Sequence, residues 1–373
     1  MRRRVVILVA ASAVFATTLL VATVGGAPRS ARSSRPAYIL NDGHVHLTNY
    51  IQDGIDARQL LAVMDDKVGR AVLFGIPLQQ TWSYRMSGEN APTYYLESDA
   101  DLYYYSFTDA NIALAYRSLP KELQARFDPM ITGFNPADMY AADHVRRVLE
   151  LFPDTFVGIG EFSLHKEFVT AKIAGEAPSI EDPALDRLLR FAGEVGLVAL
   201  VHCDIDTPFP QAGADPAYLD PMHDLFLRHP DTTFIWAHIG LGRVVRPIAS
   251  QTKYIEALLD NPKLRNVHFD ISWSETAKYL VSSPAAVDIV ANMIERHPDR
   301  FLFGTDEVAP RTQADYLRVY DQYKPLWDKL SPDVAAKVKQ GNYARIFDEA
   351  RRKVHAWQEQ NRVRRQILGV RTK

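Results

Sequence analysis

Eight short apolar stretches, rich in β-branched and aromatic residues, recur along the chain between residues 37 and 304. They occupy residues 37–40, 70–76, 130–134, 155–160, 197–201, 233–237, 266–271 and 301–304. Amphipathic segments with helical periodicity lie between them, including residues 57–68, 141–152, 185–195 and 286–296. Continuously apolar strands that alternate with helices are typical of a parallel sheet covered by helices. Eight such units predict an α/β fold, a (β/α)8 TIM barrel.

A fixed spacing connects prolines with polar residues near the ends of these stretches. A residue with a metal-binding type of side chain follows eight positions after each of four prolines, in the pairs Pro36–His44, Pro153–Glu161, Pro230–His238 and Pro298–Asp306. Prolines mark turns and helix ends. The equal spacing therefore predicts that these four side chains lie at the same height of the barrel.

His44 and His46 form a His-x-His pair directly after the first apolar stretch. Side chains alternate along an extended chain, so these two imidazoles point to the same side. Imidazole is a common ligand of zinc and related ions. His202 adds a further candidate ligand at the end of the fifth stretch. All six residues would meet at the C-terminal mouth of the barrel, where active sites of this architecture lie.

Several motifs around these residues resemble the amidohydrolase superfamily, and most closely its amidohydrolase-related (amidohydrolase 2) branch. They are His-Val-His at 44–46, Ile-Gly-Glu-Phe at 159–162, Leu-Val-His-Cys at 200–203, Trp-Ala-His-Ile-Gly-Leu-Gly at 236–242, Phe-Gly-Thr-Asp at 303–306 and Gly-Asn-Tyr-Ala-Arg-Ile-Phe at 341–347. The resemblance spans roughly residues 38–350. It implies a metal-dependent barrel enzyme.

The resemblance also implies roles for individual residues. His44, His46 and His202 are expected to bind metal, and Asp306 is expected to bind metal and to take a proton from water that the metal has acidified. For His238, binding of a second ion and polarisation of the substrate carbonyl both remain open. Imidazole and carboxylate ligands together suit a divalent ion, with zinc expected and manganese, iron or nickel also compatible.

Glu161 departs from the commonest family pattern. Many relatives place a carboxylated lysine after the fourth strand, and Lys166 comes five residues too late to be that lysine. A glutamate at this place is similar to that of TatD-type deoxyribonucleases and related binuclear members, where it bridges two ions. A structural role as a helix cap or ion-pair partner is the alternative. On the binuclear interpretation we expect about two ions per chain, whereas a single ion would favour mononuclear chemistry, including decarboxylation.

Candidate substrate-binding residues follow from position alone. An aromatic stretch at residues 82–107, with Trp82 and Tyr104, follows the second strand, and it is expected to form either a wall of the site or a structural flap or dimer contact. Arg243 is placed either to meet a substrate carboxylate or to be solvated. Asp204 is placed to line the pocket or to shape its loop.

The N-terminus has the pattern of an export segment. Arg2, Arg3 and Arg4 precede an apolar run at residues 5–24, small residues at 25–27 and a polar linker at 28–36. A cleaved signal peptide and a membrane anchor both remain open, with a periplasmic, extracellular or membrane-anchored catalytic domain. The single cysteine, Cys203, excludes an intramolecular disulfide.

The remaining chain is expected to form one catalytic domain at residues 37–350, followed by a basic helix or tail at 351–373 with eight Lys/Arg and one acid. Contact of this tail with an anionic membrane surface is the alternative to a solvated helix. The formal net charge is −2, and the three arginines of residues 1–27 leave −5 for the rest. That balance argues against a nucleic-acid partner, which requires a basic face.

These features together predict an exported, metal-dependent hydrolase that uses activated water on a C–N or C–O bond of a small molecule. A mononuclear metal-dependent decarboxylase of the same branch is the alternative. A barrel that only binds a ligand is a second alternative, against which the complete set of candidate ligands argues. The sequence indicates no oligomeric state.

Overall fold

The computed structural model describes residues 38–49, 52–76, 80–81, 105–166, 170–171, 179–207, 213–242 and 251–367. The chain divides into two units, residues 1–36 and 37–373. The predicted export segment, the wall residues Trp82 and Tyr104, and Arg243 lie outside the described residues. Among those that are described, no helix is both long enough and apolar enough to cross a membrane.

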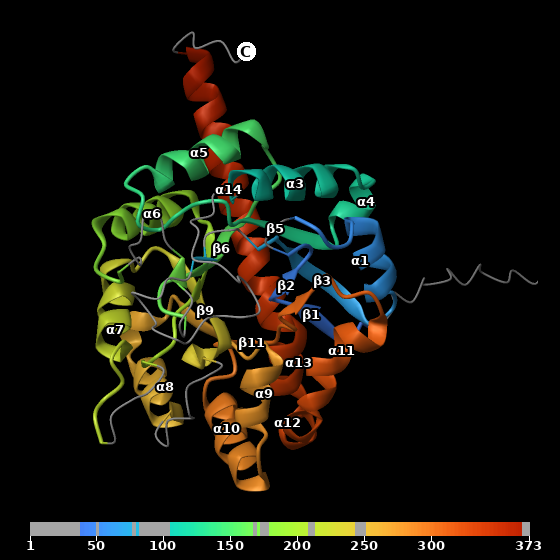
Figure 1. The fold of residues 1–373 in the computed structure, drawn as a ribbon, viewed down its shortest axis with the longest axis vertical. Helices are drawn as coiled ribbons and strands as arrows, with labels where there is room; N and C mark the ends of the chain where they lie inside the picture. The colour runs from blue at the N-terminus through green and yellow to red at the C-terminus, as the bar shows by residue number, and fades with distance from the viewer. Residues whose placement is uncertain are drawn as a thin grey trace, which may run out of the picture. The chain divides into compact units, whose positions relative to one another are not determined.

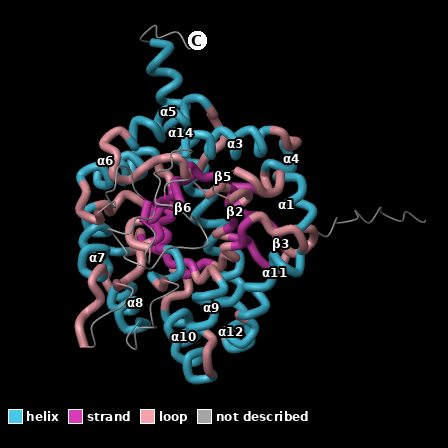
Figure 2. Tube along the Cα trace, in the orientation of Figure 1, coloured by secondary structure: helices cyan, strands magenta, loops and turns pink. Residues whose placement is uncertain are grey.

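Eight parallel strands form one sheet in the order β1, β3, β5, β6, β8, β9, β10, β11. Their bounds are β1 Leu40–Asp42, β3 Val68–Leu73, β5 Phe127–Ile131, β6 Gly158–Ser163, β8 Val198–His202, β9 Thr233–Trp236, β10 Val267–Asp270 and β11 Phe301–Leu302. Nearly every strand residue is buried, as the apolar stretches predicted. Figure 2 shows the strands at the centre with helices around them, and the predicted TIM barrel is confirmed.

The first and last strands meet just beyond their ends. The Gly43 amide donates to the Phe303 carbonyl at 3.0 Å. The short strand β2 (Val45–His46) then pairs in parallel with β12 (Glu307–Val308). The chain after β1 and the chain after β11 are therefore joined side by side at the mouth of the barrel.

β1 and β3 are shifted by two to three residues from the expected stretches at 37–40 and 70–76, and β5 and β6 differ from their predicted positions as well. β5 begins three residues earlier than expected and contains Pro129, which has no N–H; its carbonyl accepts from the Val157 amide at 2.9 Å. β6 runs three residues further than expected because the register shifts between Ile159 and Phe162. Gly160 in this irregularity has φ of +113°, and a side chain there would collide with the Leu200 carbonyl.

Helices pack around the outside of the sheet (Figure 1). Their bounds are α1 Ala57–Met64, α3 Tyr105–Arg117, α4 Lys121–Gln124, α5 Ala141–Leu151, α6 Pro183–Val195, α7 Leu219–Arg228, α8 Gln251–Asp260, α9 Ser274–Leu280, α10 Pro284–Arg296, α11 Gln313–Gln322, α12 Lys324–Lys329, α13 Pro332–Ala336 and α14 Asn342–Ile367. Side-chain caps fix several starts: Asp56 and Gln59 form a capping box at α1, and Asp182 and Ser283 cap α6 and α10, each followed by proline. The helices predicted from the amphipathic segments are present.

The helix α14 closes the N-terminal end of the barrel. Asn342 donates to the carbonyls of Pro298 and Phe301, and Arg351 donates to the Phe127 carbonyl and to the buried carboxylate of Asp128. Further along, Trp357 packs edge-on against Phe191 of α6. One continuous helix therefore runs through residue 350, where the sequence suggested the domain ends, and the basic segment continues it as far as Ile367.

Candidate metal centre

The six residues predicted to meet at the mouth do meet there, each delivered by a different part of the barrel rim. His44 follows β1 and His46 lies in β2, while His202 ends β8. His238 lies in the short helix η1 (Ala237–Gly240) after β9, and Asp306 lies between β11 and β12. Glu161 was expected after the strand but lies inside β6, at the register shift between Ile159 and Phe162. All six are buried except Asp306, whose side chain is 14% exposed.

Four of these residues form the first donor set, defined as His44, His46, Glu161 and Asp306. One oxygen of Asp306, Oδ1, lies 3.3 Å from His44 Nε2 and 3.1 Å from His46 Nε2. One oxygen of Glu161, Oε2, lies 3.7 Å and 3.6 Å from the same two nitrogens. Two imidazole nitrogens and two carboxylate oxygens thus surround one point.

The second donor set consists of Glu161, His202 and His238. It uses the other oxygen of Glu161, Oε1, which lies 2.6 Å from His202 Nδ1 and 3.7 Å from His238 Nε2. Asp306 Oδ2 lies 3.9 Å from His238 Nε2. Glu161 is therefore the residue common to both sets, with one oxygen toward each.

Three histidines are held in the tautomer that suits a metal ligand. His44 Nδ1 donates to Asp270 Oδ2 at 3.0 Å and His46 Nδ1 donates to the Gly75 carbonyl at 3.2 Å. The Ser272 hydroxyl donates to Asp270 and its oxygen accepts from His238 Nδ1 at 2.9 Å. Metal-binding histidines commonly engage their second nitrogen in this way. When its Nε2 carries no proton, each of these histidines can present a lone pair to the centre.

The described structure leaves one strongly buried nitrogen unsatisfied at this point. His44 Nε2 is inaccessible to solvent and has no hydrogen-bond partner among the described residues. Gly304 makes room for the ring, since a side chain there would clash with His44 Cβ. Imidazole lone pairs and carboxylate oxygens repel one another unless a cation or protons lie between them. The donor chemistry therefore fits a divalent metal ion.

The ionisable side chains of the centre shift one another's pKa values. Burial by itself would lower the pKa of His44, but the carboxylates of Asp306 and Asp270 outweigh it and hold that pKa well above its ordinary value. Burial would raise the pKa of Asp306, yet His44, His46 and His238 hold it well below the ordinary value. The carboxylates thus attract positive charge into the centre, which is the condition for binding a cation.

His202 differs from the other three histidines. Its Nδ1 faces Glu161 Oε1 at 2.6 Å and its Nε2 faces Asp204 Oδ1 at 3.1 Å, so both nitrogens contact carboxylates. Burial opposes protonation of His202, but these two carboxylates prevail and raise its pKa. Asp204, predicted either to line the pocket or to shape its loop, is buried against His202.

Asp270 and Ser272 belong to this centre and were not predicted. Asp270 ends β10, and its second oxygen accepts from the His238 and Ser272 amides at 2.8 and 3.0 Å. The proline spacing contained the signal, because Asp270 follows Pro262 by eight residues. The indole ring of Trp273 lies 5.0 Å from the His238 ring and forms an aromatic wall that was not predicted either.

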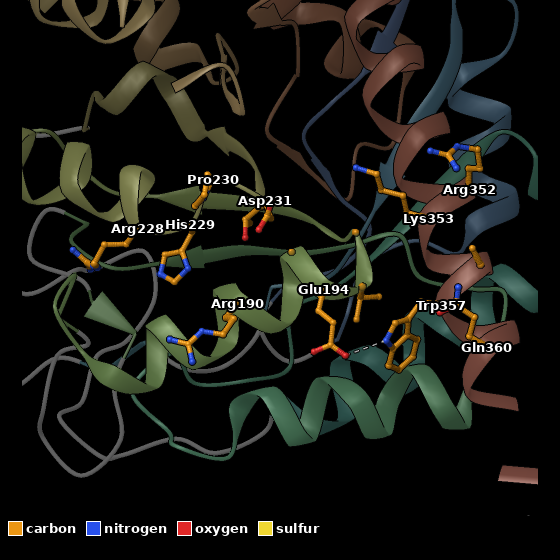
Figure 3. A pocket seen from close by; sticks show the side chains of 15 residues that line it. Arg190, Glu194, Arg228, His229, Pro230, Asp231, Arg352, Lys353, Trp357 and Gln360 are labelled. Atoms are coloured by element: carbon orange, nitrogen blue, oxygen red, sulfur yellow. Dashed lines mark hydrogen bonds between the residues drawn. The ribbon is translucent and has the colours of Figure 1, made fainter. Parts of the chain in front are cut away.

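A separate hollow of about 780 Å³ lies at the other end of the barrel, where Gly196 and Thr232 precede β8 and β9 (Figure 3). Its lining mixes charges: Arg228 is paired with Asp186, Arg352 is paired with Glu349, and Glu194 accepts from the Trp357 indole. None of its lining residues belongs to the two donor sets. The lining has four basic and two acidic side chains, and three of the basic ones, Arg228, Arg352 and Lys353, are paired with Asp186 or Glu349.

Comparison with known proteins identifies one family. The sequence profile of a family described as amidohydrolase matches residues 42–348, which include all six predicted residues. No protein in the curated collection matches the chain.

Solved structures resemble the fold at low sequence identity. An amidohydrolase from Burkholderia multivorans with bound zinc is 14% identical, with 83% of this chain and 99% of that chain covered and a TM-score of 0.51. A protein assigned as a 2-pyrone-4,6-dicarboxylic acid hydrolase from Pseudomonas putida is 14% identical over 84% and 98%, with a TM-score of 0.49. A 2,6-dihydroxybenzoate decarboxylase from Rhizobium is 14% identical over 83% and 99%, with a TM-score of 0.45.

Proposed function

The chain belongs to the amidohydrolase family, and from this premise we propose that it is a metal-dependent hydrolase acting on a C–N or C–O bond of a small molecule. The observation that carries the proposal is the first donor set. Its two Nε2 lone pairs face two carboxylate oxygens in a buried centre, with the opposite ring nitrogens already engaged by Asp270 and Gly75.

We propose that this first donor set holds one divalent ion, with zinc as the expected metal. When bound, such an ion lowers the pKa of a water molecule toward ~7 and polarises a carbonyl group. Manganese, iron and nickel suit the same mixture of imidazole and carboxylate.

The remaining steps fall to side chains of the centre. Asp306 is the most accessible of the six residues and its carboxylate is ionised, so it is placed to accept a proton from the attacking water. His238 presents Nε2 between Glu161 and Asp306, and in its protonated form it is placed to polarise the substrate carbonyl. The proton that Asp306 takes from the water would then pass to the leaving group. Trp273 beside it offers an apolar surface for the substrate.

The test begins with protein purified without chelator. We expect bound divalent metal and hydrolysis of members of a panel of amides, lactones and esters, lost on chelation and restored by zinc or manganese. The variant Asp306→Asn keeps the shape of the side chain and should lose turnover by several orders of magnitude. Metal-free wild-type protein that hydrolyses the same substrates at full rate would refute the proposal.

A metal-dependent decarboxylase is the second candidate, and one observation favours it. The ammonium of Lys166 is buried and lies 4.0 Å from Glu161 Oε1, so the centre has positive charge beside it that would attract a substrate carboxylate. Release of carbon dioxide from aromatic or unsaturated acids, with no hydrolysis of the panel above, would select this reaction. Tight metal binding without any turnover would instead indicate a barrel that only binds a ligand.

We propose further that the catalytic domain is exported, on the basis of the arginines at positions 2–4 and the apolar run at 5–24. Fusion of residues 1–36 to alkaline phosphatase, which is active only outside the cytoplasm, should give an active reporter. Deletion of residues 5–24 from the fusion is the matched control and should abolish that activity. An inactive full fusion would contradict export.

A further inference from the structure

We propose that the ammonium of Lys166 takes the place of a second metal ion, so that the centre holds one divalent ion and one fixed organic cation. The inference rests on the proposed metal site and specifies how many ions it holds. It differs from the two-ion expectation drawn from Glu161 in the sequence, and one measurement decides between them.

Lys166 is brought to the mouth by the backbone hydrogen bonds of the two residues that precede it. The Leu164 amide donates to the His202 carbonyl at 2.9 Å, and the Asp204 amide donates to the His165 carbonyl at 2.7 Å. The segment after β6 therefore continues alongside the end of β8. Lys166 follows directly, and only 8% of its surface is exposed. Its Nζ lies 4.0 Å from Glu161 Oε1.

Glu161 divides its two oxygens between the two donor sets, and Lys166 approaches only one of them. Oε2 faces His44 and His46 at 3.7 and 3.6 Å, whereas Oε1 faces His202 and lies 4.0 Å from Lys166 Nζ. Lys166 also acts electrostatically on both Glu161 and His202. The positive charge thus stands beside the oxygen of Glu161 that belongs to the second set.

The second set is poorly prepared for a divalent ion in two further respects. Like charges in a buried site repel strongly because little water screens them, so an ion sharing Glu161 Oε1 would compete with the ammonium. His202 offers its Nδ1 to this set, and that nitrogen is already in contact with Glu161 at 2.6 Å, while Asp204 engages its Nε2. In the first set, His44 has one nitrogen engaged by Asp270, and its Nε2 has no hydrogen-bond partner among the described residues. His46 Nε2 contacts Asp306 Oδ1 at 3.1 Å, which is a longer contact than that of His202 Nδ1 with Glu161.

The role of Lys166 follows from this arrangement. In a two-ion site a bridging carboxylate is neutralised by both ions. Here one ion and one ammonium would share the two oxygens of Glu161. The ammonium would then keep Glu161 oriented toward the first set and supply fixed positive charge on the side of His238, where the substrate carbonyl is proposed to bind.

The experiment measures bound metal directly. Wild-type protein and the neutral variants Lys166→Met and Lys166→Gln are equilibrated with manganese at a series of free concentrations. Bound ions per chain are determined by elemental analysis, and spin-coupled manganese pairs by electron paramagnetic resonance. We expect one ion in wild type without pair signals, and a second ion with pair signals in both neutral variants. Lys166→Arg keeps the charge and should bind one.

Two controls separate this effect from general changes in charge or fold. Lys278→Met removes an exposed lysine that pairs with Glu275 on α9, and should leave the stoichiometry at one. Lys166→Met combined with His202→Ala removes a donor that belongs only to the second set, and should return the stoichiometry from two to one. Circular dichroism and thermal unfolding check that each variant is folded.

The outcomes are distinct. Two ions in wild type would overturn the inference and leave the proposed metal site intact. One ion in wild type and still one in both neutral variants would show that Lys166 does not exclude the second ion, which also overturns it. No bound ion in wild type at any concentration would overturn both this inference and the proposed function.

Discussion

Changing Asp270 to asparagine tests the centre through a residue that is not itself one of the six predicted there. Asp270 is fully buried, and Oδ2 accepts from His44 Nδ1 at 3.0 Å. Its other oxygen accepts from the amides of His238 and Ser272 and from the Ser272 hydroxyl. An asparagine that keeps these three contacts must turn its amide NH2 toward His44 Nδ1.

The consequence concerns the proton on His44. Nδ1 would then have to accept a hydrogen bond, so the proton would move to Nε2, the nitrogen that faces the first donor set. A protonated Nε2 has no lone pair for a metal. Loss of such a supporting contact typically costs about 10- to 100-fold in metal affinity, which corresponds to about 1.4–2.8 kcal/mol. We expect the upper end, because the tautomer changes as well as the charge.

The assay is competition for zinc with a chromophoric chelator, which gives the dissociation constant directly. The matched control is Asp109→Asn. Asp109 is also a buried carboxylate that accepts from two backbone amides, those of Thr132 and Gly133, but it belongs to neither donor set. This control should leave zinc affinity unchanged even where it lowers stability. Equal zinc affinity in wild type and Asp270→Asn, with both folded, would refute the reasoning about His44.

Three further predictions use stability as the measurement. Zinc at 100 times its dissociation constant should raise the free energy of unfolding of wild type in urea by about 2.7 kcal/mol. This stabilisation should vanish in His44→Ala, and an equal stabilisation of the variant would place the ion elsewhere. Asp128→Asn should cost about 3 kcal/mol, the low end for breaking a buried ion pair, because its partners Arg70 and Arg351 are 20% and 37% exposed. A change below about 1 kcal/mol in the same unfolding assay would contradict a stabilising role of this buried carboxylate between β3 and α14. Burial, together with Arg345 and Arg300, lowers the pKa of His268 from 6.5 to about 3. Below pH 6.5 the unfolded chain therefore binds a proton that the folded chain does not, and stability should fall as the pH drops from 6.5 toward 3. His268→Gln should flatten that part of the pH–stability curve, and an unchanged slope would exclude His268 as its source.

The fold could be predicted from the sequence because every barrel strand is buried on both faces. The eight apolar stretches stand out against amphipathic helices for that reason, and each contains or overlaps an observed strand. The strand bounds were less predictable where the backbone departs from a regular ladder. Pro129 is tolerated inside β5, and Gly160 shifts the register of β6, so Glu161 lies within a strand instead of after it. Such departures depend on which residues of the neighbouring strands lie opposite, and the local sequence does not contain that information.

Four of the six residues at the mouth could be predicted because each follows a proline by eight residues, and His46 and His202 because they follow or end an apolar stretch. Asp270 also follows a proline, Pro262, by eight residues. It lies within the apolar stretch 266–271, however, and was therefore assigned to the strand and not to the site. Its importance comes from contacts with His44 and His238, which are 226 and 32 residues away in the chain. Pairwise contacts of that kind are visible only in three dimensions.

Lys166 shows what spacing in the sequence does not reveal. Five residues after Glu161 is too far for a ligand projecting from the same strand position, and on that ground the sequence argued against Lys166 as the family's metal-binding lysine. The chain after β6, however, does not leave the mouth: hydrogen bonds to both His202 and Asp204 keep residues 164 and 165 beside the end of β8. A lysine side chain is long enough to return from there to Glu161, and its ammonium arrives 4.0 Å from the oxygen that the second donor set would need. A residue that cannot act as a ligand by its position in the sequence can therefore still decide, by its charge, how many ions the ligands hold.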